Sequence, residues 1–379
     1  AFNAVQDHIS NGKISAGHDI GSGGLITTLL ELCFPSISVG MNINFNGLEE
    51  TDLVKILFSE KVGVVLQSKE NLTYSFDKYG VKAIKIGETI KQNILSIGKL
   101  QLSISSLRNT WMATSTKLEL HQTKTSLAAK RAKNVINQPL KFNFPNKFNG
   151  KIPFQKQNTL KAAVIREKGS NSEREMAYMM DLSGFEVRDV HMTDLIEGRE
   201  NLEDINLLVA VGGFSNSDVL GSAKGWAGAF KYNPKAKSAI ENFFGRTDTL
   251  SLGVCNGCQL FVELGLITPN HNRKPKMLHN DSGKFECIFT AVAIEKSKAI
   301  MLNGLEGSIL GIWAAHGEGK FSFPQDESNY QIPAKYLYQN YPSNPNGSDF
   351  NAAMLSSEDG RHLVMMPHLE RSIFPWNWG

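Results

Sequence analysis

The sequence predicts two domains of different class, a smaller α+β domain followed by a doubly wound α/β domain. Strand-type segments dominate the first hundred residues, a basic stretch without periodicity follows, and apolar strands alternate with helices from residue 161 onward. At roughly 150 residues per domain, the length of 379 residues allows two or three domains. We therefore expect an α+β domain over residues 1–107, a helix and basic linker over 108–160, and the α/β domain over 161–379.

The first part alternates between segments with the patterns of helices and of strands. Helices are predicted over residues 25–34 and 51–58, and strands over 39–45, 62–67, 83–86 and 100–105. This order favours a small α+β domain with a mostly antiparallel sheet.

Positive charge is concentrated in the middle of the chain. Residues 117–168 contain twelve Lys or Arg and two acids, whereas the whole chain has a net charge of 40 − 37 = +3. Residues 108–134 contain no Gly or Pro and predict a helix. The rest of this stretch has no period and predicts a linker with anchoring aromatics, namely Phe142, Phe144, Phe148 and Phe154. Such a segment is also compatible with a nucleic-acid-binding arm. Docking on acidic domains of the same polypeptide is the simpler interpretation, so we expect no nucleic-acid partner.

The third part alternates between buried strands and helices. Strands are predicted over 161–165, 186–190, 207–211, 250–254 and 363–366, and helices over 173–182, 235–244 and 256–264. Apolar strands joined by helices indicate a doubly wound α/β domain, whose ligand site lies at the carboxyl ends of the strands.

The composition excludes several classes of protein. Hydrophobic residues (41%) and charged residues (20%) are as frequent as in soluble globular proteins, which excludes a disordered or fibrous chain. The longest apolar run, residues 24–34, contains Glu31 and is shorter than the ~18 residues of a membrane helix. The first ten residues lack the basic start and apolar centre of a targeting segment. Four cysteines do not form a disulfide framework in so long a chain. We expect a cytoplasmic protein with no membrane partner.

The segment Gly253-Val254-Cys255-Asn256-Gly257 carries the sharpest chemical signal. Glycines two residues before and after a nucleophile, between an apolar strand and a helix, are the pattern of a nucleophile elbow with cysteine in place of serine. The turn strains the nucleophile, and a side chain at either glycine would collide with neighbouring backbone. The helix after Cys255 favours the thiolate form of its sulfur. The N–H of Asn256 is one natural oxyanion donor.

Other interpretations of this segment remain open. Cys255 and Cys258 have the spacing of a redox dithiol or of half a zinc site, and Cys255 is also compatible with a buried structural role. Zinc needs two further ligands at suitable spacing, whereas Cys33 and Cys287 stand alone. A dithiol does not account for both glycines. We therefore favour the nucleophile elbow.

A cysteine nucleophile needs a base and a group that orients the base. Among nine histidines the best candidate is His368, which follows the strand predicted over 363–366. Residues two apart in an extended segment face the same side, so Glu370 can fix the imidazole tautomer as in a catalytic triad. Most His-x-Glu pairs lie on the solvated surface. This pair is a candidate for catalysis because the same chain has the cysteine elbow.

Several segments carry a family resemblance. They are GVCNGCQL from residue 253, VGGFSNSDVLGSAKGWA from 211, AAHGEGKF from 314, YPSNPNGS from 341, MPHLERS from 366 and GHDIGSGGL from 17. The first five together resemble the class I glutamine amidotransferase domain of the phosphoribosylformylglycinamidine synthase family. The sixth resembles a signature in the last synthetase domain of the same family, which is similar to aminoimidazole ribonucleotide synthetase. The resemblance covers nearly the whole chain in the family's order.

The resemblance implies roles for residues at matching positions. Cys255, His368 and Glu370 fall on the catalytic triad, and the implied oxyanion donors are Gly213, Phe214 and Asn256. The implied glutamine pocket includes Gln259, His316, Asn346 and Ser348, each of which is equally compatible with a structural role. Asp19 matches a magnesium-binding position. In the family a serine followed by a small residue commonly stands at the nucleotide contact. This chain has Gly21-Ser22 there, so the implied nucleotide contact falls on Gly21 or on Ser22.

The resemblance also implies an activity. Glutamine would be hydrolysed to glutamate and ammonia, and the ammonia would pass to a synthetase site that uses ATP and Mg²⁺. There formylglycinamide ribonucleotide would become formylglycinamidine ribonucleotide, with ADP and phosphate as co-products. The implied partners are these substrates and the synthetase domains of the same polypeptide. Because the chain begins with Ala1 rather than Met, we expect most of the synthetase to lie upstream. The alternative is a cysteine hydrolase or another amidotransferase on the same α/β scaffold.

Overall fold

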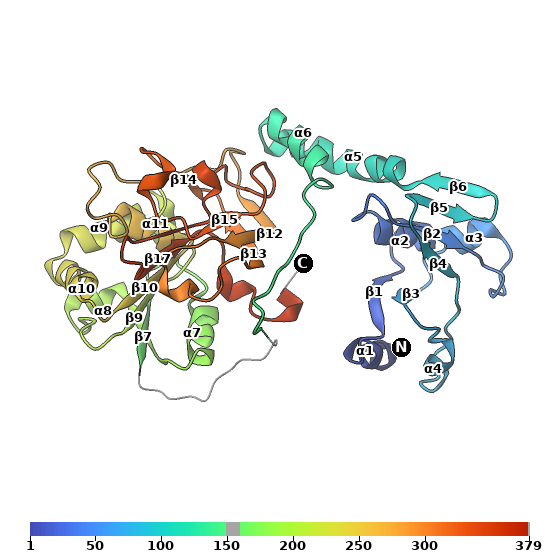
Figure 1. Ribbon diagram of the computed structural model, residues 1–379, viewed down its shortest axis with the longest axis horizontal. Helices are drawn as coiled ribbons and strands as arrows, with labels where there is room; N and C mark the ends of the chain where they lie inside the picture. Colours follow the sequence, from blue (N-terminus) through green and yellow to red (C-terminus); the bar gives the residue numbers. More distant parts are fainter. Residues whose placement is uncertain (149–159, 378–379) are drawn as a thin grey trace. The chain divides into compact units, whose positions relative to one another are not determined.

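The structure, a computed structural model, describes residues 1–148 and 160–377. Contacts within the chain divide it into two compact units, Ala1–His121 and Gln122–Gly379. In Figure 1 the first unit is coloured from blue to cyan and the second from cyan-green to red. None of the helices in the described ranges has the length and apolar character needed to cross a membrane.

The first unit contains a four-stranded sheet and a separate strand pair. Its helices are α1 (Phe2–Ser10), α2 (Gly24–Cys33), α3 (Leu53–Phe58), α4 (Thr73–Asp77) and α5 (Ile104–Gln122), and its strands are β1 (Ile14–Asp19), β2 (Gly40–Ile43), β3 (Val64–Ser68), β4 (Gly87–Ile90), β5 (Ile94–Ile97) and β6 (Leu100–Ser103). The sheet has the order β4-β2-β5-β6. The pair β2 and β5 is parallel, and the other pairs are antiparallel, as is β1 with β3. The predicted α+β domain with a mostly antiparallel sheet is confirmed.

The core of the first unit forms between α2 and the four-stranded sheet. Leu29 of α2 and Leu95 of β5 are both almost completely buried in it. The turn before α2 depends on glycine, because Gly24 has a φ of 73° and a Cβ there would lie 2.7 Å from the carbonyl oxygen of Leu57 in α3. The glycine-rich segment is therefore fixed by backbone conformation and by close packing.

Two predictions around this unit were wrong. Residues 83–86 form no strand, and the neighbouring residues 87–90 form β4 instead. The helix predicted over 108–134 is interrupted, because α5 ends at Gln122 and α6 (Thr125–Asn134) begins after two non-helical residues. No Gly or Pro marks this break, so helix propensity did not reveal it. The strands β1 and β5 were not predicted.

The second unit is a doubly wound α/β domain. Its main sheet contains β7 (Lys161–Arg166), β8 (Glu186–His191), β9 (Leu207–Ala210), β10 (Leu250–Val254), β16 (Met354–Ser356) and β17 (His362–Met365), and its helices include α7 (Glu173–Leu182), α8 (Met192–Glu197), α9 (Lys224–Tyr232), α10 (Pro234–Gly245) and α11 (Asn256–Glu263). The order is β16-β17-β10-β9-β7-β8. Strand β16 runs antiparallel to β17, and the other neighbouring pairs are parallel. The predicted fold class is confirmed.

The strand order reverses between β7 and β9. From β7 the chain adds β8 on one side and β9, β10 and β17 on the other. The connections that leave β7 and β9 therefore continue in opposite directions along the sheet, and in doubly wound sheets the ligand crevice lies at this point. Backbone hydrogen bonds join these two loops: the N–H of Asn171 donates to the Gly212 carbonyl, and the N–H of Phe214 donates to the Gly169 carbonyl, both at 2.9 Å. The crevice thus lies beside the carboxyl end of β10, where Cys255 follows.

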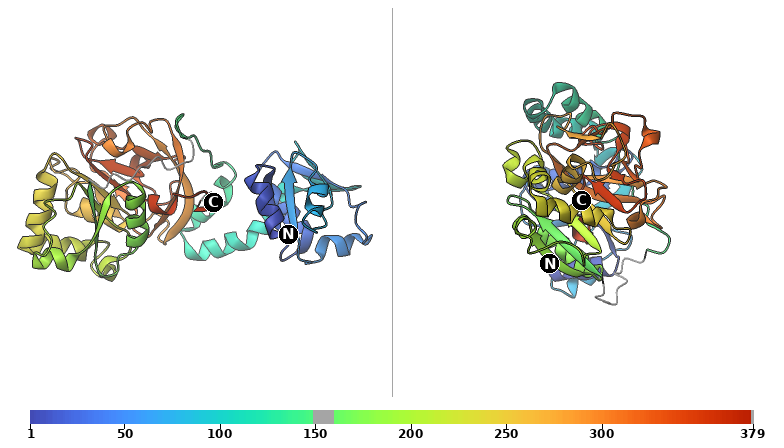
Figure 2. Two further views of the ribbon diagram at one scale, coloured as in Figure 1. Left: turned by 90° about the horizontal axis from the view of Figure 1, so that it is seen from below. Right: turned by 90° about the vertical axis from the view of Figure 1, so that its left-hand side faces the viewer.

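An antiparallel sheet of the second unit was not predicted. It has the order β13-β12-β15, formed by β12 (Glu286–Ile294), β13 (Ile309–His316) and β15 (Ala334–Tyr336), and the short strands β11 (Lys276–Leu278) and β14 (Lys320–Ser322) pair separately. In Figures 1 and 2 these orange and red strands lie beside the main sheet. A bridge between Trp313 and His368 joins β13 to the segment after β17. This bridge brings the end of β13 to the carboxyl edge of the main sheet.

Of the predicted helix and basic linker over 108–160, residues 122–148 pack within the second unit. Asn143 pairs with Ile309 through two backbone hydrogen bonds of 2.9 and 2.8 Å. The guanidinium of Arg131 in α6 donates to the carboxylate of buried Glu286 at 2.8 Å, and the Tyr341 hydroxyl donates to the same carboxylate at 3.0 Å. The remainder of the predicted linker, residues 149–159 with Phe154, lies outside the described residues.

A buried histidine of β17 gives the fold a predictable acid sensitivity. His362 is 4% exposed, its Nδ1 lies 3.0 Å from the Ser251 hydroxyl, and its Nε2 has no partner among the described residues. Burial, together with the charge of Arg361, lowers the pKa of His362 to about 4. An unfolded imidazole titrates near 6.5, so the unfolded chain binds this proton first as the pH falls. His362 therefore costs no stability above pH 6.5 and destabilises the fold progressively between pH 6.5 and 4, by about 3 kcal/mol in total.

Replacing His362 with Gln is expected to flatten this pH dependence. The measurement is scanning calorimetry of the chain at pH 7, 6 and 5, in which the wild-type transition should fall more steeply than that of His362→Gln. The exposed His121 supplies a matched control, and His121→Gln should keep the wild-type slope. Parallel slopes for the wild type and His362→Gln would contradict the assignment.

Candidate active site

Cys255 lies at a sharp turn between β10 and α11. Its φ of 52° and ψ of −106° are strained for a residue other than glycine. The turn is held to the neighbouring strand because the N–H of Cys255 donates to the Met365 carbonyl at 2.8 Å. The side chain is 6% exposed, with its sulfur 3.8 Å from the carbonyl oxygen of Ala315. The strained turn expected of a nucleophile elbow is present.

The glycines on either side of Cys255 are required by close backbone contacts. A Cβ at Gly253 would lie 2.6 Å from the Gly257 carbonyl oxygen, and a Cβ at Gly257 would lie 2.0 Å from the Ala210 carbonyl oxygen of β9. Backbone atoms cannot rotate away as side chains do, so both positions exclude a side chain. The predicted collisions are confirmed, and they show how closely α11 approaches the sheet.

His368 and Glu370 lie next to Cys255. The N–H of His368 donates to the Trp313 carbonyl at 2.7 Å, and Nδ1 of the imidazole is 2.6 Å from Oε1 of Glu370. The two residues are 1% and 3% exposed. A Cβ at Gly212 would lie 2.8 Å from Cε1 of His368 and 3.4 Å from Cβ of Cys255, so the imidazole and the cysteine contact the same glycine. The structure thus brings together the three residues predicted as a triad.

The charges of this group stabilise one another. Burial acts to lower the pKa of His368, but its interactions with Cys255 and Glu370 outweigh burial and raise that pKa to about 9. Burial likewise acts to raise the pKa of Glu370, and the hydrogen bond and charge of His368 outweigh it, so that the pKa is lowered. At neutral pH the pair is therefore an imidazolium and a carboxylate.

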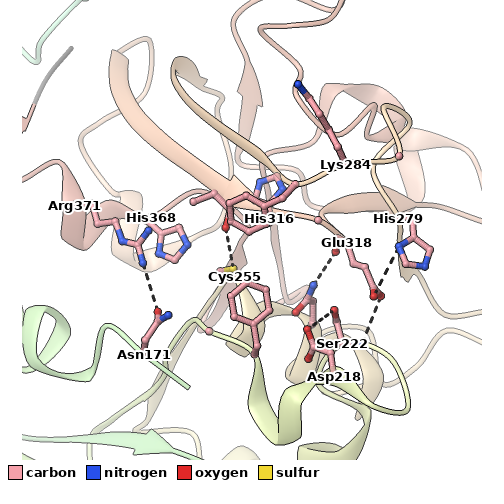
Figure 3. A pocket seen from close by; sticks show the side chains of 17 residues that line it. Asn171, Asp218, Ser222, Cys255, His279, Lys284, His316, Glu318, His368 and Arg371 are labelled. Carbon is pink, nitrogen blue, oxygen red and sulfur yellow. Dashed lines mark hydrogen bonds and ion pairs between the residues drawn. The ribbon is translucent and has the colours of Figure 1, made fainter. Parts of the chain in front are cut away.

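A cavity of about 390 Å³ opens at Cys255, as the close-up in Figure 3 shows. Its walls include Asn171, Gly213, Phe214, Asp218, Ser222, Gln259, His279, Lys284, Phe285, His316, Glu318, His368 and Arg371. Sequence reasoning did not single out Asp218, Glu318 or Arg371, although each lies within a quoted motif. No local signal shows which side chains of those motifs face the cavity, because the loops that carry them are irregular.

The predicted oxyanion donors differ in availability. Asn256 is the first residue of α11, so its N–H has no preceding helical turn to which to donate. Gly213 lines the cavity, whereas the N–H of Phe214 already donates to the Gly169 carbonyl. The side-chain oxygen of Asn256 accepts from the N–H of Ser215 at 3.2 Å. This bond holds the loop of Gly213 against the start of α11.

Gln259 and His316 both line the cavity, but their bonding differs. The amide of Gln259 accepts from Asn256 at 2.9 Å and donates to the Glu318 carbonyl at 2.8 Å, so it braces the wall. His316, at the end of β13, is 2% exposed, and neither of its ring nitrogens has a partner among the described residues. Burial, then the charge of His368, lowers the pKa of His316 to about 3, and the imidazole is neutral.

The structure does not bring Asn346 and Ser348 to this cavity. The Ser348 hydroxyl donates to Asn346 at 2.9 Å, the Asn346 amide donates to the Tyr336 hydroxyl at 3.1 Å, and the Phe321 N–H donates to the Ser348 hydroxyl at 3.0 Å. These bonds form an internal network that fixes the loop after residue 340. Both residues are buried within it.

The predicted nucleotide and metal residues lie together in the first unit, in the turn between β1 and α2. Asp19 ends β1 and has a side chain that is 82% exposed. Gly21 accepts a backbone hydrogen bond from Gly24 at 3.0 Å, and Ser22 lies between them. Within residues 1–148 and 160–377, no three His, Cys, Asp or Glu side chains gather as metal ligands. One exposed carboxylate does not by itself build a magnesium site.

Cys258 has a different environment from Cys255. It is completely buried in the core of the second unit. Burial, with the charge of Cys255, raises the pKa of Cys258 well above its ordinary value. Cys258 therefore packs as a small apolar residue.

The fold and the site define the class of this protein, a doubly wound α/β domain with a cysteine at a nucleophile elbow. The family model described as CobB/CobQ-like glutamine amidotransferase domain matches residues 159–379, and the chain belongs to this family. A second model, the C-terminal domain of AIR synthase related proteins, matches residues 2–98. These matches agree with the resemblance seen in the motifs.

Curated relatives match the chain along its whole length. It is 39% identical to phosphoribosylformylglycinamidine synthase of Dictyostelium discoideum, with 100% of this chain and 32% of the relative covered. Identity is 40% to the probable chloroplastic/mitochondrial enzyme of that name in Arabidopsis thaliana and 35% to that of Homo sapiens, with 100% of this chain and 29% and 31% of the relatives covered. The chain thus spans about a third of these relatives. A solved structure of PurLQS from Thermotoga maritima has a TM-score of 0.48 and 27% identity, over 58% of this chain and 92% of that one.

Proposed function

We propose that this chain is the glutaminase portion of a phosphoribosylformylglycinamidine synthase. The observation that carries the proposal is the buried His368–Glu370 pair beside Cys255 at a strained turn, in a chain of the glutamine amidotransferase family. The chemistry is hydrolysis of the side-chain amide of glutamine to glutamate and ammonia.

In the first half of the reaction the Cys255 thiolate attacks the amide carbon of glutamine. The carbonyl oxygen becomes an oxyanion, which the N–H groups of Asn256 and Gly213 stabilise. As the carbon–nitrogen bond breaks, His368 gives its proton to the departing nitrogen, and ammonia leaves behind a glutamyl thioester. Glu370 keeps the imidazole in the orientation that permits this transfer.

In the second half a water molecule attacks the thioester. His368, now neutral, takes a proton from that water, and the carbon–sulfur bond breaks to release glutamate and the thiolate. Burial of the triad, with each of the three side chains 6% exposed or less, keeps other water from competing for the protons.

We further propose that this chain works within a polypeptide as long as its relatives. There the ammonia would serve an ATP- and Mg²⁺-dependent amidation of formylglycinamide ribonucleotide. The turn of Asp19, Gly21 and Ser22 is this chain's contribution to that site by resemblance. Asp19 is an exposed carboxylate, and Glu60 accepts from the N–H of Gly23 in the same turn at 2.9 Å. Two carboxylates do not complete the oxygen ligands that Mg²⁺ needs, and we derive no step through it.

A reactive glutamine analogue tests the glutaminase proposal. We expect 6-diazo-5-oxo-L-norleucine to add one equivalent of covalent mass to the chain, on the peptide that contains Cys255, and excess glutamine to slow the labelling. Cys255→Ala should not be labelled, whereas Cys287→Ala, which removes an exposed cysteine, should be labelled as the wild type is. Labelling that persists in Cys255→Ala would sink the assignment of the nucleophile.

A further inference from the structure

One wall of the cavity at Cys255 is formed by the loop that leads into β12. We call residues 279–286 the wall loop. Four of its residues line the cavity, as Figure 3 shows for two of them: His279, Gly283, Lys284 and Phe285. Glu286, the last residue of the wall loop, begins β12 and pairs across the sheet with His316, which also lines the cavity. A displacement of the wall loop therefore changes the shape of the cavity.

Within the cavity wall, buried Asn280 bonds the wall loop to the end of β13. Its side chain is part of a residue that is 2% exposed, and it donates to the carbonyl oxygens of His316 at 2.6 Å and Lys284 at 3.0 Å. The same side chain accepts from the N–H of Gly319 at 3.0 Å. The wall loop and residues 316–319 thus form one continuous wall.

The wall loop is also bonded to α6, on the side away from the cavity. The carbonyl oxygen of Ser282 accepts from the Thr123 hydroxyl at 2.8 Å and from the N–H of Lys124 at 3.4 Å. The guanidinium of Arg131 donates to the carboxylate of Glu286 at 2.8 Å. These bonds are made at Ser282 and Glu286, the two positions that flank the cavity-lining residues 283–285.

The ion pair between Arg131 and Glu286 is suited to fixing one arrangement of the chain. The side chain of Glu286 is 2% exposed and that of Arg131 is 26% exposed, and the Tyr341 hydroxyl donates to the same carboxylate at 3.0 Å. Replacing such a buried pair with apolar residues is often neutral for stability, whereas removing one partner leaves a buried charge uncompensated. The pair therefore specifies where the wall loop lies more than it adds to the stability of the fold.

We infer that Arg131 is a positioning residue for the glutaminase reaction, because through Glu286 it holds the wall loop in the conformation that binds glutamine. This inference rests on the proposed glutaminase function. The helix α6 lies before residue 159, where the glutamine amidotransferase match begins, so the match itself does not include this residue.

Loss of Arg131 should act on substrate binding rather than on the chemical step. A wall loop that is no longer held must become ordered when glutamine binds, and this ordering reduces affinity. The N–H of His368 is bonded to the Trp313 carbonyl, which does not involve α6. We therefore expect KM for glutamine to rise and kcat to stay nearly unchanged.

The test measures amide hydrogen exchange and glutamine hydrolysis on the same variants of the whole chain. In Arg131→Met we expect the amides of residues 279–286 to exchange about tenfold faster than in the wild type, the usual effect of losing one hydrogen bond to a charged group. Strands β7 and β10 should exchange at the wild-type rate. The KM for glutamine should rise by about tenfold, with kcat changed less than threefold.

Two further variants separate positioning from folding. The double variant Arg131→Met/Glu286→Leu leaves no buried charge, so it should unfold at a higher temperature than Arg131→Met while keeping the raised KM and the fast exchange. Thr123→Val removes only the hydroxyl that donates to Ser282 and should raise both the exchange rate and KM by about threefold.

Two single substitutions in α6 provide the matched controls. Lys133→Met removes a basic side chain from an exposed position of the same helix and should match the wild type in exchange, KM and kcat. Arg131→Lys keeps the charge with fewer donors and should recover part of the affinity for glutamine that Arg131→Met loses.

The outcomes distinguish the inference from the function on which it rests. Exchange in the wall loop that does not change in Arg131→Met would overturn the inference, and so would faster exchange with an unchanged KM. A double variant that regains both the wild-type unfolding temperature and the wild-type KM would mean a purely structural role. In these cases the wild type would still hydrolyse glutamine, and the proposed function would stand. A wild-type chain that releases no ammonia from glutamine and is not labelled at Cys255 would overturn both.

Discussion

Replacing His368 with Asn is expected to lower kcat for glutamine hydrolysis by about 10³-fold, equivalent to about 4 kcal/mol of transition-state stabilisation. The imidazole of His368, bonded to Glu370 beside Cys255, is the group to which we assign giving a proton to the departing nitrogen and taking one from water. Asparagine retains a polar side chain of similar size but does neither. The measurement is steady-state release of glutamate, with KM for glutamine expected to change little.

Because His368 is buried and bonded to Glu370, the control for this substitution is a histidine outside the cavity. His121 is exposed at the end of α5, and His121→Asn should hydrolyse glutamine at the wild-type rate. A His368→Asn variant that keeps more than a tenth of the wild-type kcat, while folding normally, would rule out His368 as the proton donor.

Replacing Gly257 with Ala is expected to destabilise the second unit by about 3 kcal/mol or more. The added methyl group would lie 2.0 Å from the carbonyl oxygen and 2.5 Å from the carbonyl carbon of Ala210. Either α11 must move away from β9 or the strand must shift, and both changes open the core. For a unit of this size we expect the calorimetric transition to fall by about 6–12 °C.

A second glycine provides the comparison for this substitution. Gly245 ends α10, and a Cβ there meets no atom within 4 Å. Gly245→Ala should therefore leave the transition unchanged or raise it slightly, since alanine favours the helix. If Gly257→Ala unfolds at the same temperature as Gly245→Ala, then α11 does not lie as close to β9 as the structure places it.

The main sheet was predictable because its strands and helices are distinct in the sequence. The strand β10 and the helix α7 were predicted with the bounds that the structure gives them. The strand β10 is a short apolar run that ends at the elbow, and α7 is a ten-residue amphipathic segment that ends before Ser183 and Gly184. Local pattern sufficed there, since each segment is buried as its pattern implies.

The antiparallel sheet was missed for the opposite reason. The strand β12 includes Glu286, whose buried carboxylate is stabilised by partners from α6 and from the loop at Tyr341. Glu286 is the first residue of β12 and an apolar run follows it, but the partners of its carboxylate are 155 and 55 residues away in the chain. No local window reveals such a pairing.

The site was predictable to the extent that its geometry is local. The glycines around Cys255 and the spacing of His368 and Glu370 are local, and the structure brings these side chains together. The position of Asp218 on the cavity wall depends on the left-handed turn that ends at this residue. Asparagine tolerates that conformation, but nothing in Asn-Ser-Asp requires it, because the requirement comes from surrounding tertiary structure.

The contacts of α6 bear on where the second domain begins in the sequence. The family model begins at residue 159, yet Arg131 and Asn143 are bonded into the same unit. Residues 122–148, which lie between the two family matches, thus fold as part of the second unit. The compact unit therefore starts at Gln122, 37 residues (159 − 122) before the family match does.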